Sequence, residues 1–157
     1  MLKVRYPKDL KKFENYDLGC SDWFLIDQKL INTFAKLSGD DQWIHVDSDR
    51  ALSEMPEGKT IAHGLLTLCI SPFLGKNKIH IEFLKHTLNY GIDKVRFISP
   101  VKVGSFIRLK SKIAKVTLRD DASVLVRIER IMEIKGIERL AMYAETLSLM
   151  YTGEPTN

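Results

Sequence analysis

Residues 64–75, GLLTLCISPFLG, are the part of the sequence on which the fold depends. On a helix, their apolar side chains would cover most of the circumference: Leu65, Leu66, Leu68, Cys69, Ile70, Phe73 and Leu74. A helix with this pattern is usually enclosed by protein. The apolar segment 61–75 is interrupted by His63, Ser71 and Pro72 and falls short of the roughly 20 residues that span a membrane. The sequence therefore predicts a buried helix here, with other elements of the chain wrapped around it.

The chain after this helix has the composition and partial alternation of β-strands. Four such segments are present: 90–99, 105–118, 123–134 and 138–151. The connections between them carry turn residues, namely Pro100 and Gly104, Arg119-Asp120-Asp121, and Lys135-Gly136. Connections this short predict antiparallel neighbours. With a further short strand expected near 23–26, the sequence predicts an α+β protein in which an antiparallel sheet curls around one helix.

The third predicted strand indicates which faces of the sheet are covered. Its first half separates apolar from charged side chains by alternation, with Val124, Val126 and Ile128 on one face and Arg127 and Glu129 on the other. This pattern is typical of a sheet that buries one side only. Ile131 and Ile134 depart from the alternation and predict a bulge near Arg130.

Two helices are expected before residue 60. Asp27 can cap a helix through Leu30, Ile31, Phe34 and Leu37 that stops at Ser38-Gly39, and Asp47 can cap a short helix through Ala51 and Leu52 that ends at Pro56 and Gly58. Between them we expect an irregular stretch, 40–46.

Length and composition are those of one domain. The chain has 157 residues, of which 45% are hydrophobic, and we expect a single domain over 1–157 with loose ends at about 1–15 and 152–157. The net charge of +4 comes from charges spread along the chain, without the basic block of a nucleic-acid arm or membrane anchor. The first 16 residues lack the apolar core of a signal peptide, and Cys20 and Cys69 form no CxxC motif. A cytoplasmic protein with free thiols is therefore expected.

The stretch 38–47, SGDDQWIHVD, places a carboxylate and an imidazole five residues apart, at Asp40 and His45. Hydrating a double bond needs one group that takes a proton from water and another that delivers one, and this pair is suited to both tasks. The alternative is that Asp40 caps the next helix or closes an Asx turn after Gly39, with His45 packed beneath the loop. The spacing alone leaves both interpretations open.

Residues 61–64, IAHG, open the apolar helix. Free backbone N–H groups and the positive end of the helix dipole can stabilise an oxyanion there, and Gly64 would let a thioester carbonyl approach closely. The alternative is that Gly64 serves tight packing of helix on sheet. For His63 we favour a hydrogen bond to a nearby backbone group over a reactive role.

Further motifs follow these in order. Together the set comprises 34–40 (FAKLSGD), 41–47 (DQWIHVD), 61–64 (IAHG), 89–91 (NYG) and 95–104 (VRFISPVKVG). These motifs resemble the MaoC-like family of (R)-specific enoyl-CoA hydratases, and residues 41–47 are most similar to its nodulation protein N subgroup. The likeness covers most of the chain from about Ile26 onward. It implies a hot-dog fold, a curved antiparallel sheet wrapped around a central apolar helix.

The resemblance also implies a reaction. It would be the reversible addition of water to a trans-2-enoyl thioester by a homodimer, giving a (3R)-hydroxyacyl thioester carried by coenzyme A or acyl carrier protein. The residues matching Asp40 and His45 would activate water for addition at C3, and the Gly64 N–H matches the oxyanion donor. No metal or redox cofactor is required, and no nucleic-acid or membrane partner is expected.

The sequence departs from the family pattern at two places. Gln42-Trp43 replaces the usual Asn-Pro; Gln42 could still orient His45 by a hydrogen bond, while Trp43 could line the acyl pocket or pack the loop. Cys69 stands where these hydratases usually carry a serine that supports the site, and a thiol is a poorer donor. Inside an apolar helix Cys69 is not expected to act as a nucleophile.

Two other functions stay open from the sequence. A thioesterase would use the same helix N-terminus for a tetrahedral oxyanion, although the spacing of Asp40 and His45 argues against it. A non-catalytic acyl-CoA-binding protein is favoured chiefly by Cys69. Four basic residues could contact the phosphates of the carrier: Lys94, Arg96, Lys102 and Arg108. They could equally be ordinary solvated charges on strands.

Overall fold

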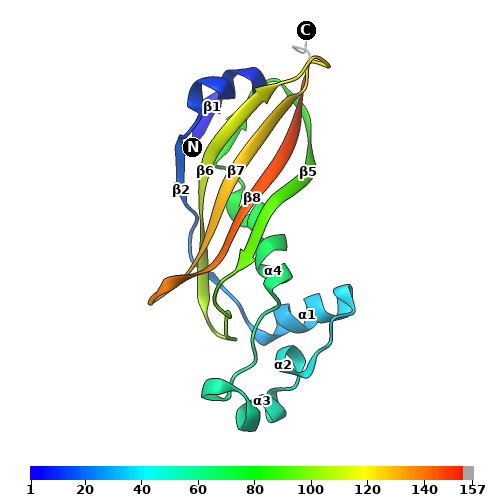
Figure 1. Ribbon diagram of the computed structural model, residues 1–157, viewed down its shortest axis with the longest axis vertical. Coiled ribbons are helices and arrows are strands. Elements are labelled where there is room, and N and C mark those ends of the chain that lie inside the picture. The colour runs from blue at the N-terminus through cyan, green and yellow to red at the C-terminus, as the bar shows by residue number, and fades with distance from the viewer. Residues whose placement is uncertain (154–157) are drawn as a thin grey trace.

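Four long antiparallel strands form the framework of the computed structural model, which describes residues 1–153: β5 (Leu84–Phe97), β6 (Phe106–Leu118), β7 (Val124–Ile134) and β8 (Ile137–Thr152). The main sheet has the order β2-β6-β7-β8-β5, where β2 is Asp17–Cys20, and the short β3 (Phe24–Leu25) also pairs with β6. The sheet is long and curved, and helix α4 lies against one of its faces (Figure 1). The predicted α+β class is confirmed, as is the short strand expected within 23–26.

The prediction that short connections join neighbouring strands holds for β6, β7 and β8 but is wrong for β5 and β6. β5 pairs with β8, so two strands separate it from β6. The backbone of the connecting segment bonds to distant parts of the chain: Ile98 N–H donates to Ala141, and Val101 C=O accepts from Ala62. The segment thereby crosses the end of the sheet instead of turning back on itself.

The apolar segment forms two short helices, α4 (Gly64–Cys69) and α5 (Ser71–Gly75). Leu66 and Leu74 are buried in a core with side chains from β6, β7 and β8. The prediction of a helix enclosed on most sides is wrong for the single chain, because Leu65 is 54% and Phe73 50% exposed. The sheet covers one face of this helix pair and leaves an apolar face open.

The N-terminal 15 residues are not loose, contrary to the prediction. β1 (Leu2–Val4) pairs in parallel with β4 (Ile79–Ile81), and the 3-10 helix η1 (Pro7–Phe13) inserts Leu10, which is fully buried, into a second apolar cluster on the sheet. The prediction missed Leu10 because the lysines around it make the segment look like a solvated terminus. At the other end β8 extends to Thr152, and the remainder of the predicted loose end, residues 154–157, lies outside the described residues.

β7 keeps its alternation along its whole length. Val124, Val126 and Ile128 are buried as predicted, and the inward phase continues through Arg130 to Met132 and Ile134. The register with β6 is unbroken from Ile128 to Ile134, so the predicted bulge near Arg130 is wrong. Ile134 points inward like Val124, Val126 and Ile128, in the same alternation. Arg130 is a charged residue at one of these inward positions. The strand tolerates this because the guanidinium reaches polar groups between two apolar clusters.

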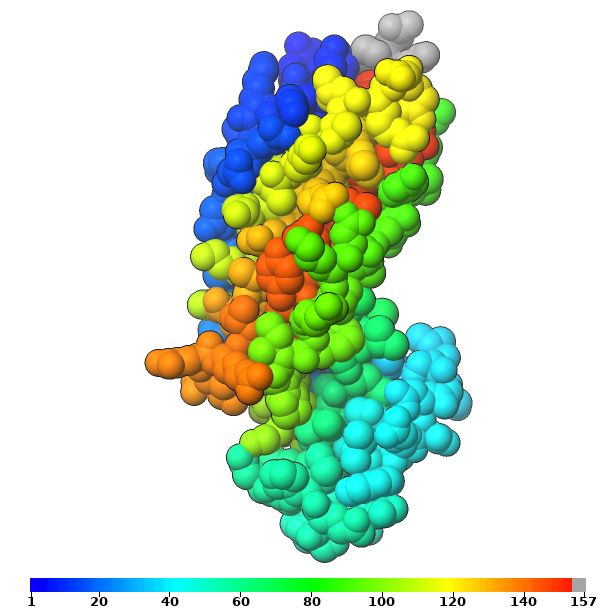
Figure 2. Space-filling view, in the orientation of Figure 1, coloured from blue at the N-terminus to red at the C-terminus, as the bar shows by residue number. Residues whose placement is uncertain are grey.

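Helices α1 (Gln28–Ser38), α2 (Trp43–Val46) and α3 (Ser48–Glu54) form a lobe beyond one end of the sheet, followed by the 3-10 turn η2 (Pro56–Gly58) (Figures 1 and 2). Both predicted caps are confirmed: the Asp27 carboxylate accepts from Leu30 N–H at 2.8 Å and Asp47 accepts from Arg50 N–H at 2.9 Å. Gly39, at φ 75°, ends α1 as predicted.

Two details of this lobe differ from the predictions. The stretch 40–46 is not wholly irregular, because it contains α2. Leu37 is 82% exposed, so it is not on the core face, which is formed by Ile31 and Ala35. Within the described residues, no helix is long and apolar enough to span a membrane.

The capping hydrogen bond of Asp27 leads to a first prediction, which concerns the stability of the protein. Asp27→Ala removes the acceptor for the Leu30 N–H and should lower the free energy of unfolding by about 1 kcal/mol. Urea unfolding followed by circular dichroism measures the change. Asp27→Asn, which keeps a capping oxygen, is the matched control, and an equal loss in both variants would show that the cap is not responsible.

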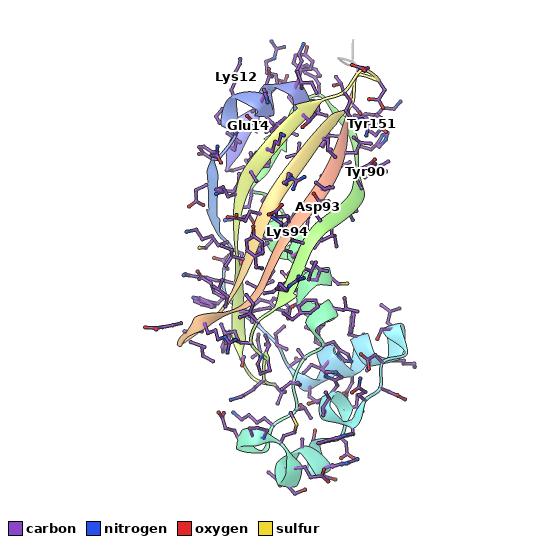
Figure 3. The ribbon with its side chains drawn as sticks, viewed as in Figure 1. Lys12, Glu14, Tyr90, Asp93, Lys94 and Tyr151 are labelled. Atoms are coloured by element: carbon purple, nitrogen blue, oxygen red, sulfur yellow. The ribbon has the colours of Figure 1, made fainter. Side chains whose placement is uncertain are left out.

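Charged side chains form a network on the face of the sheet opposite the core. Glu145 on β8 accepts hydrogen bonds from Lys94 at 2.9 Å, from Arg127 at 2.7 Å and from the Tyr143 hydroxyl at 3.0 Å. Arg127 also pairs with Asp93 at 2.6 Å, and Asp93 and Lys94 lie in front of the strands in Figure 3. The bond from Lys94, then those from Arg127 and Tyr143, lower the pKa of Glu145 from 4.5 to about 2.

This shift predicts an acid-sensitive contribution to stability. The pKa of Glu145 is lower in the folded than in the unfolded chain, so the contribution is complete above about pH 4.5 and disappears as the pH falls to about 2. Glu145→Gln should flatten the dependence of unfolding free energy on pH in that window, as measured by urea unfolding at a series of pH values. The exposed Glu138 on the same strand supplies the control, Glu138→Gln, which should leave the wild-type profile unchanged. An unaltered profile in Glu145→Gln would contradict the assignment.

Candidate active site

Three polar side chains predicted from separate motifs meet between the helical lobe and the start of α4. Asp40 follows the left-handed Gly39 at the end of α1, His45 lies on α2, and His63 precedes α4. One polar atom from each side chain lies within 4.8 Å of the other two. Both histidines are buried, and Asp40 is partly exposed, so the group faces solvent on the carboxylate side.

The hydrogen bonds of His45 define where its proton lies. Its Nδ1 is 2.7 Å from the carbonyl oxygen of Ile61. Because a carbonyl only accepts, Nδ1 carries the hydrogen, and the neutral ring keeps a lone pair at Nε2. The backbone of His45 is held as well, since its N–H donates to Gln42 and its carbonyl accepts from the Gln28 side chain at 2.7 Å. His45 is therefore a fixed imidazole with a basic nitrogen available.

His63 bonds to a backbone group, as favoured from the sequence. Its Nε2 donates to the backbone carbonyl of Asp40 at 2.8 Å, and its ring stacks on His45 with centroids 3.7 Å apart and planes at 25°. His63 thus holds the Asp40 backbone and supports the face of the His45 ring. Its other nitrogen, Nδ1, is buried without a partner among the described residues.

Asp and His are common metal ligands, and the three side chains lie within reach of one another. An imidazole nitrogen binds a metal ion in the plane of its ring. The two stacked rings lie in different, nearly parallel planes, so an ion in the plane of one imidazole lies outside the plane of the other. This arrangement suits proton transfer better than it suits a metal centre.

Gly64 opens a hollow of about 230 Å³ beside His45. Thr67, Phe97 and the segment 98–101 also line it. A Cβ atom on Gly64 would lie 2.6 Å from the Phe97 ring, so only glycine fits without movement. The first N–H groups of a helix have no intrahelical acceptor, and the Gly64 N–H makes no hydrogen bond within residues 1–153. The structure thus brings Gly64 and His45 to the same hollow.

The other predicted support residues lie outside this hollow. The exposed Gln42 contributes its backbone carbonyl to His45, and its side chain makes no hydrogen bond within the described chain, so the expected side-chain bond is not formed. Trp43 packs against the Arg50 guanidinium, 4.1 Å from the ring centroid, which is the loop-packing alternative. Cys69 is exposed, so its expected place inside an apolar helix is wrong, because it lies on the face that the sheet leaves open.

Sequence reasoning missed several residues that shape the site. Thr67 is 3% exposed and donates to the Gly64 carbonyl at 2.7 Å, and Phe97 covers Gly64. Gln28 joins the His45 carbonyl to the buried Thr60 hydroxyl. No local pattern marks these residues: Thr67 lies within the apolar run, and Gln28 looks like an ordinary first residue of a helix.

The basic candidates for carrier phosphate binding are mostly occupied by carboxylates. Lys94 pairs with Glu145, Lys102 with Glu57, and Arg108 with Glu133. The fourth, Arg96, donates to the backbone carbonyl of Val95. These contacts favour their interpretation as ordinary strand charges.

Comparison with known proteins gives a consistent result. Residues 13–133 match the model of the MaoC like domain. The chain is 39% identical over 139 residues to 3-hydroxyacyl-thioester dehydratase Z of Mycobacterium tuberculosis, covering 88% of this chain and 91% of that protein. It is also 39% identical over 137 residues to nodulation protein N of Rhizobium leguminosarum, covering 85% of this chain and 84% of that protein.

A solved structure supports the same fold. The unliganded (R)-hydratase PhaJ1 from Pseudomonas aeruginosa superposes with a TM-score of 0.68 at 21% identity, covering 85% of this chain and 79% of that one. The hot-dog arrangement predicted from the sequence is confirmed.

Proposed function

Because the chain belongs to the MaoC-like dehydratase family, we propose that it reversibly adds water to a trans-2-enoyl thioester, giving a (3R)-hydroxyacyl thioester. One observation carries the proposal: His45 keeps its Nε2 lone pair because Nδ1 donates to Ile61, and it shares a hollow with the unpaired N–H of Gly64. A base and an oxyanion donor are the two groups that hydration needs.

In the proposed mechanism, water lies between the Asp40 carboxylate and His45 Nε2. This pair removes a proton while the water oxygen forms a bond to C3 of the enoyl group. The electrons of the C2–C3 double bond move toward the thioester oxygen, which accepts a hydrogen bond from Gly64 N–H. The proton held by the pair is then delivered to C2, and the enolate collapses to the hydroxyacyl thioester. His63 positions both partners through the Asp40 carbonyl and the His45 ring.

We propose that this reaction uses the residues of the chain without a metal or redox cofactor, since no step changes an oxidation state of the protein or needs a Lewis acid. The carrier is coenzyme A or acyl carrier protein. The name of the mycobacterial relative refers to a 3-hydroxyacyl thioester, which is the product of hydration and the substrate of the reverse reaction. The predicted cytoplasmic location stays a prediction.

We further propose that the protein acts as a homodimer. β5 ends the strand order of the main sheet, so within residues 1–153 one of its sides pairs with no strand. Its exposed apolar residues include Leu88, Tyr90 and Ile92. Phe97 at the end of β5 is also exposed and lines the hollow, and Leu65, which follows Gly64 on α4, is exposed as well. A second copy would cover these side chains and exclude water from the site. Light scattering after size-exclusion chromatography measures the oligomeric state.

The decisive experiment follows two signals at once on adding the purified protein to crotonyl-CoA and to a longer trans-2-enoyl-CoA. Hydration lowers the enoyl absorbance without release of thiol. A thioesterase releases thiol, which a disulfide reagent detects. An unchanged absorbance with retained binding of the acyl-CoA would identify a binding protein and overturn the proposal.

A further inference from the structure

A second hollow lies on the core side of the sheet, about 140 Å³ in volume, where the turn after α5 passes over β6 and β7. It is separate from the hollow at His45, since the two share no lining residue. Its polar lining is Lys76, Asn77, Lys78, Ser111 and Arg130, and the remaining lining is Leu18, Gly75, Ile79 and Ile128. Among the described residues, no carboxylate lines it.

Arg130 is the central group of this hollow. It occupies an inward position of β7 between the two apolar clusters, two residues after Ile128 of one and two residues before Met132 of the other. Its Nε donates to the Thr146 hydroxyl at 3.0 Å and its Nη1 makes a long contact of 3.4 Å with the Ser71 carbonyl. Among the described residues no carboxylate lies within ion-pair distance of it. Partial burial without a counterion lowers the pKa of Arg130, and a charge in this position is costly unless an anion joins it.

Ser111 provides an independent second observation. It stands directly opposite Arg130 in the β6–β7 register, is 4% exposed, and its hydroxyl has no hydrogen-bond partner within the described chain. Buried hydroxyls are nearly always paired. An unpaired donor therefore lies beside an uncompensated guanidinium, at the wall of a hollow that Lys76 and Lys78 also line. Lys78 donates to the Cys20 carbonyl, and Lys76 lies over the Phe73 ring.

We propose that this hollow binds a small oxyanion, a phosphate or carboxylate group. Arg130 would donate to it through its guanidinium fork, Ser111 would donate its hydroxyl, and the two lysines would raise the local concentration of anions. Both ligand chemistries have oxygens that accept from this donor set. Gly75 leaves room for the guanidinium, because a Cβ there would lie 2.8 Å from Nη1.

The test is calorimetric titration of the full chain with inorganic phosphate and, separately, with acetate, each against sodium chloride at equal ionic strength. Tighter binding of phosphate or of acetate identifies the preferred group. Arg130→Met should weaken that binding about tenfold or more, since a charge-assisted hydrogen bond is lost, and Ser111→Ala should weaken it less. Arg130→Lys keeps the charge but not the planar fork and should fall between wild type and Arg130→Met.

The matched control is Arg139→Met, which removes an equal charge from the neighbouring strand at an exposed position. It should bind the anion as wild type does. A ligand-induced rise in melting temperature that is present in wild type and Arg139→Met but absent in Arg130→Met provides a second readout. Binding no tighter than chloride, or equal binding in Arg130→Met and Arg139→Met, overturns the proposal.

Discussion

Replacing His45 with alanine should lower kcat for hydration of a trans-2-enoyl-CoA by about 10²–10⁴-fold, the usual contribution of a positioned general base. The physical reason is that Nε2 is the nitrogen left basic by the Nδ1 hydrogen bond to Ile61. Loss of enoyl absorbance at saturating substrate measures the effect. KM should change less than kcat, because the imidazole contributes mainly in the transition state.

Two companion variants separate chemistry from packing. His45→Asn keeps an amide donor that can reach the Ile61 carbonyl but supplies no base. It should therefore be as inactive as His45→Ala, with a free energy of unfolding closer to that of wild type. His80→Ala removes an exposed histidine from β4 and should keep wild-type activity. Residual activity of His45→Asn near the wild-type level would rule out the proposed role of Nε2.

The second large effect is expected at Gly64. A Cβ at this position would lie 2.6 Å from two carbons of the Phe97 ring, too close for any contact, so Gly64→Ala must displace the ring or the start of α4. A displacement of about 1 Å at a reacting centre can cost about 10²-fold in rate, and we expect a loss of this size in kcat/KM. The assay is the same, accompanied by a melting temperature to detect unfolding.

The matched control is Gly91→Ala on β5, where the added Cβ would meet nothing closer than Leu147 at 3.8 Å. It should leave activity unchanged. Adding Phe97→Leu to Gly64→Ala relieves the clash and should restore part of the lost rate. If the double variant is no better than Gly64→Ala, contact with Phe97 is not the cause of the loss.

The fold could be predicted from the sequence wherever an element is marked by residues within the element itself. The hairpin strands β6, β7 and β8 agree with the prediction to within one residue at each end, because alternation and turn residues mark them in the sequence. The caps at Asp27 and Asp47 were predictable for the same reason. The partner of β5 was not, because the choice between β6 and β8 depends on hydrogen bonds of the crossing segment to residues far away in the chain.

In the site too, some features could be predicted from the sequence and others could not. Asp40, His45 and Gly64 were named from motif spacing and from the family resemblance. In the structure His45 lies close to Asp40 and lines a hollow together with Gly64. The stacking of His63 on His45 joins residues 18 positions apart and has no sequence signature. Cys69 was placed in the interior because the apolar helix was assumed to be covered on all sides, whereas one sheet covers only one side.

The docking of the N-terminal segment affects the order in which the protein can fold during synthesis. Leu10 is buried in a cluster whose other buried members lie between Ile81 and Met150. The ribosome must therefore synthesise the chain as far as Met150 before this half of the core can close, whereas β1 can pair with β4 as soon as Ile81 has been made. Contacts of such high sequence separation slow folding and prolong the exposure of apolar surface. A peptide tag fused before Met1 would act on this late step, and we expect refolding rate to respond to it more strongly than catalysis does.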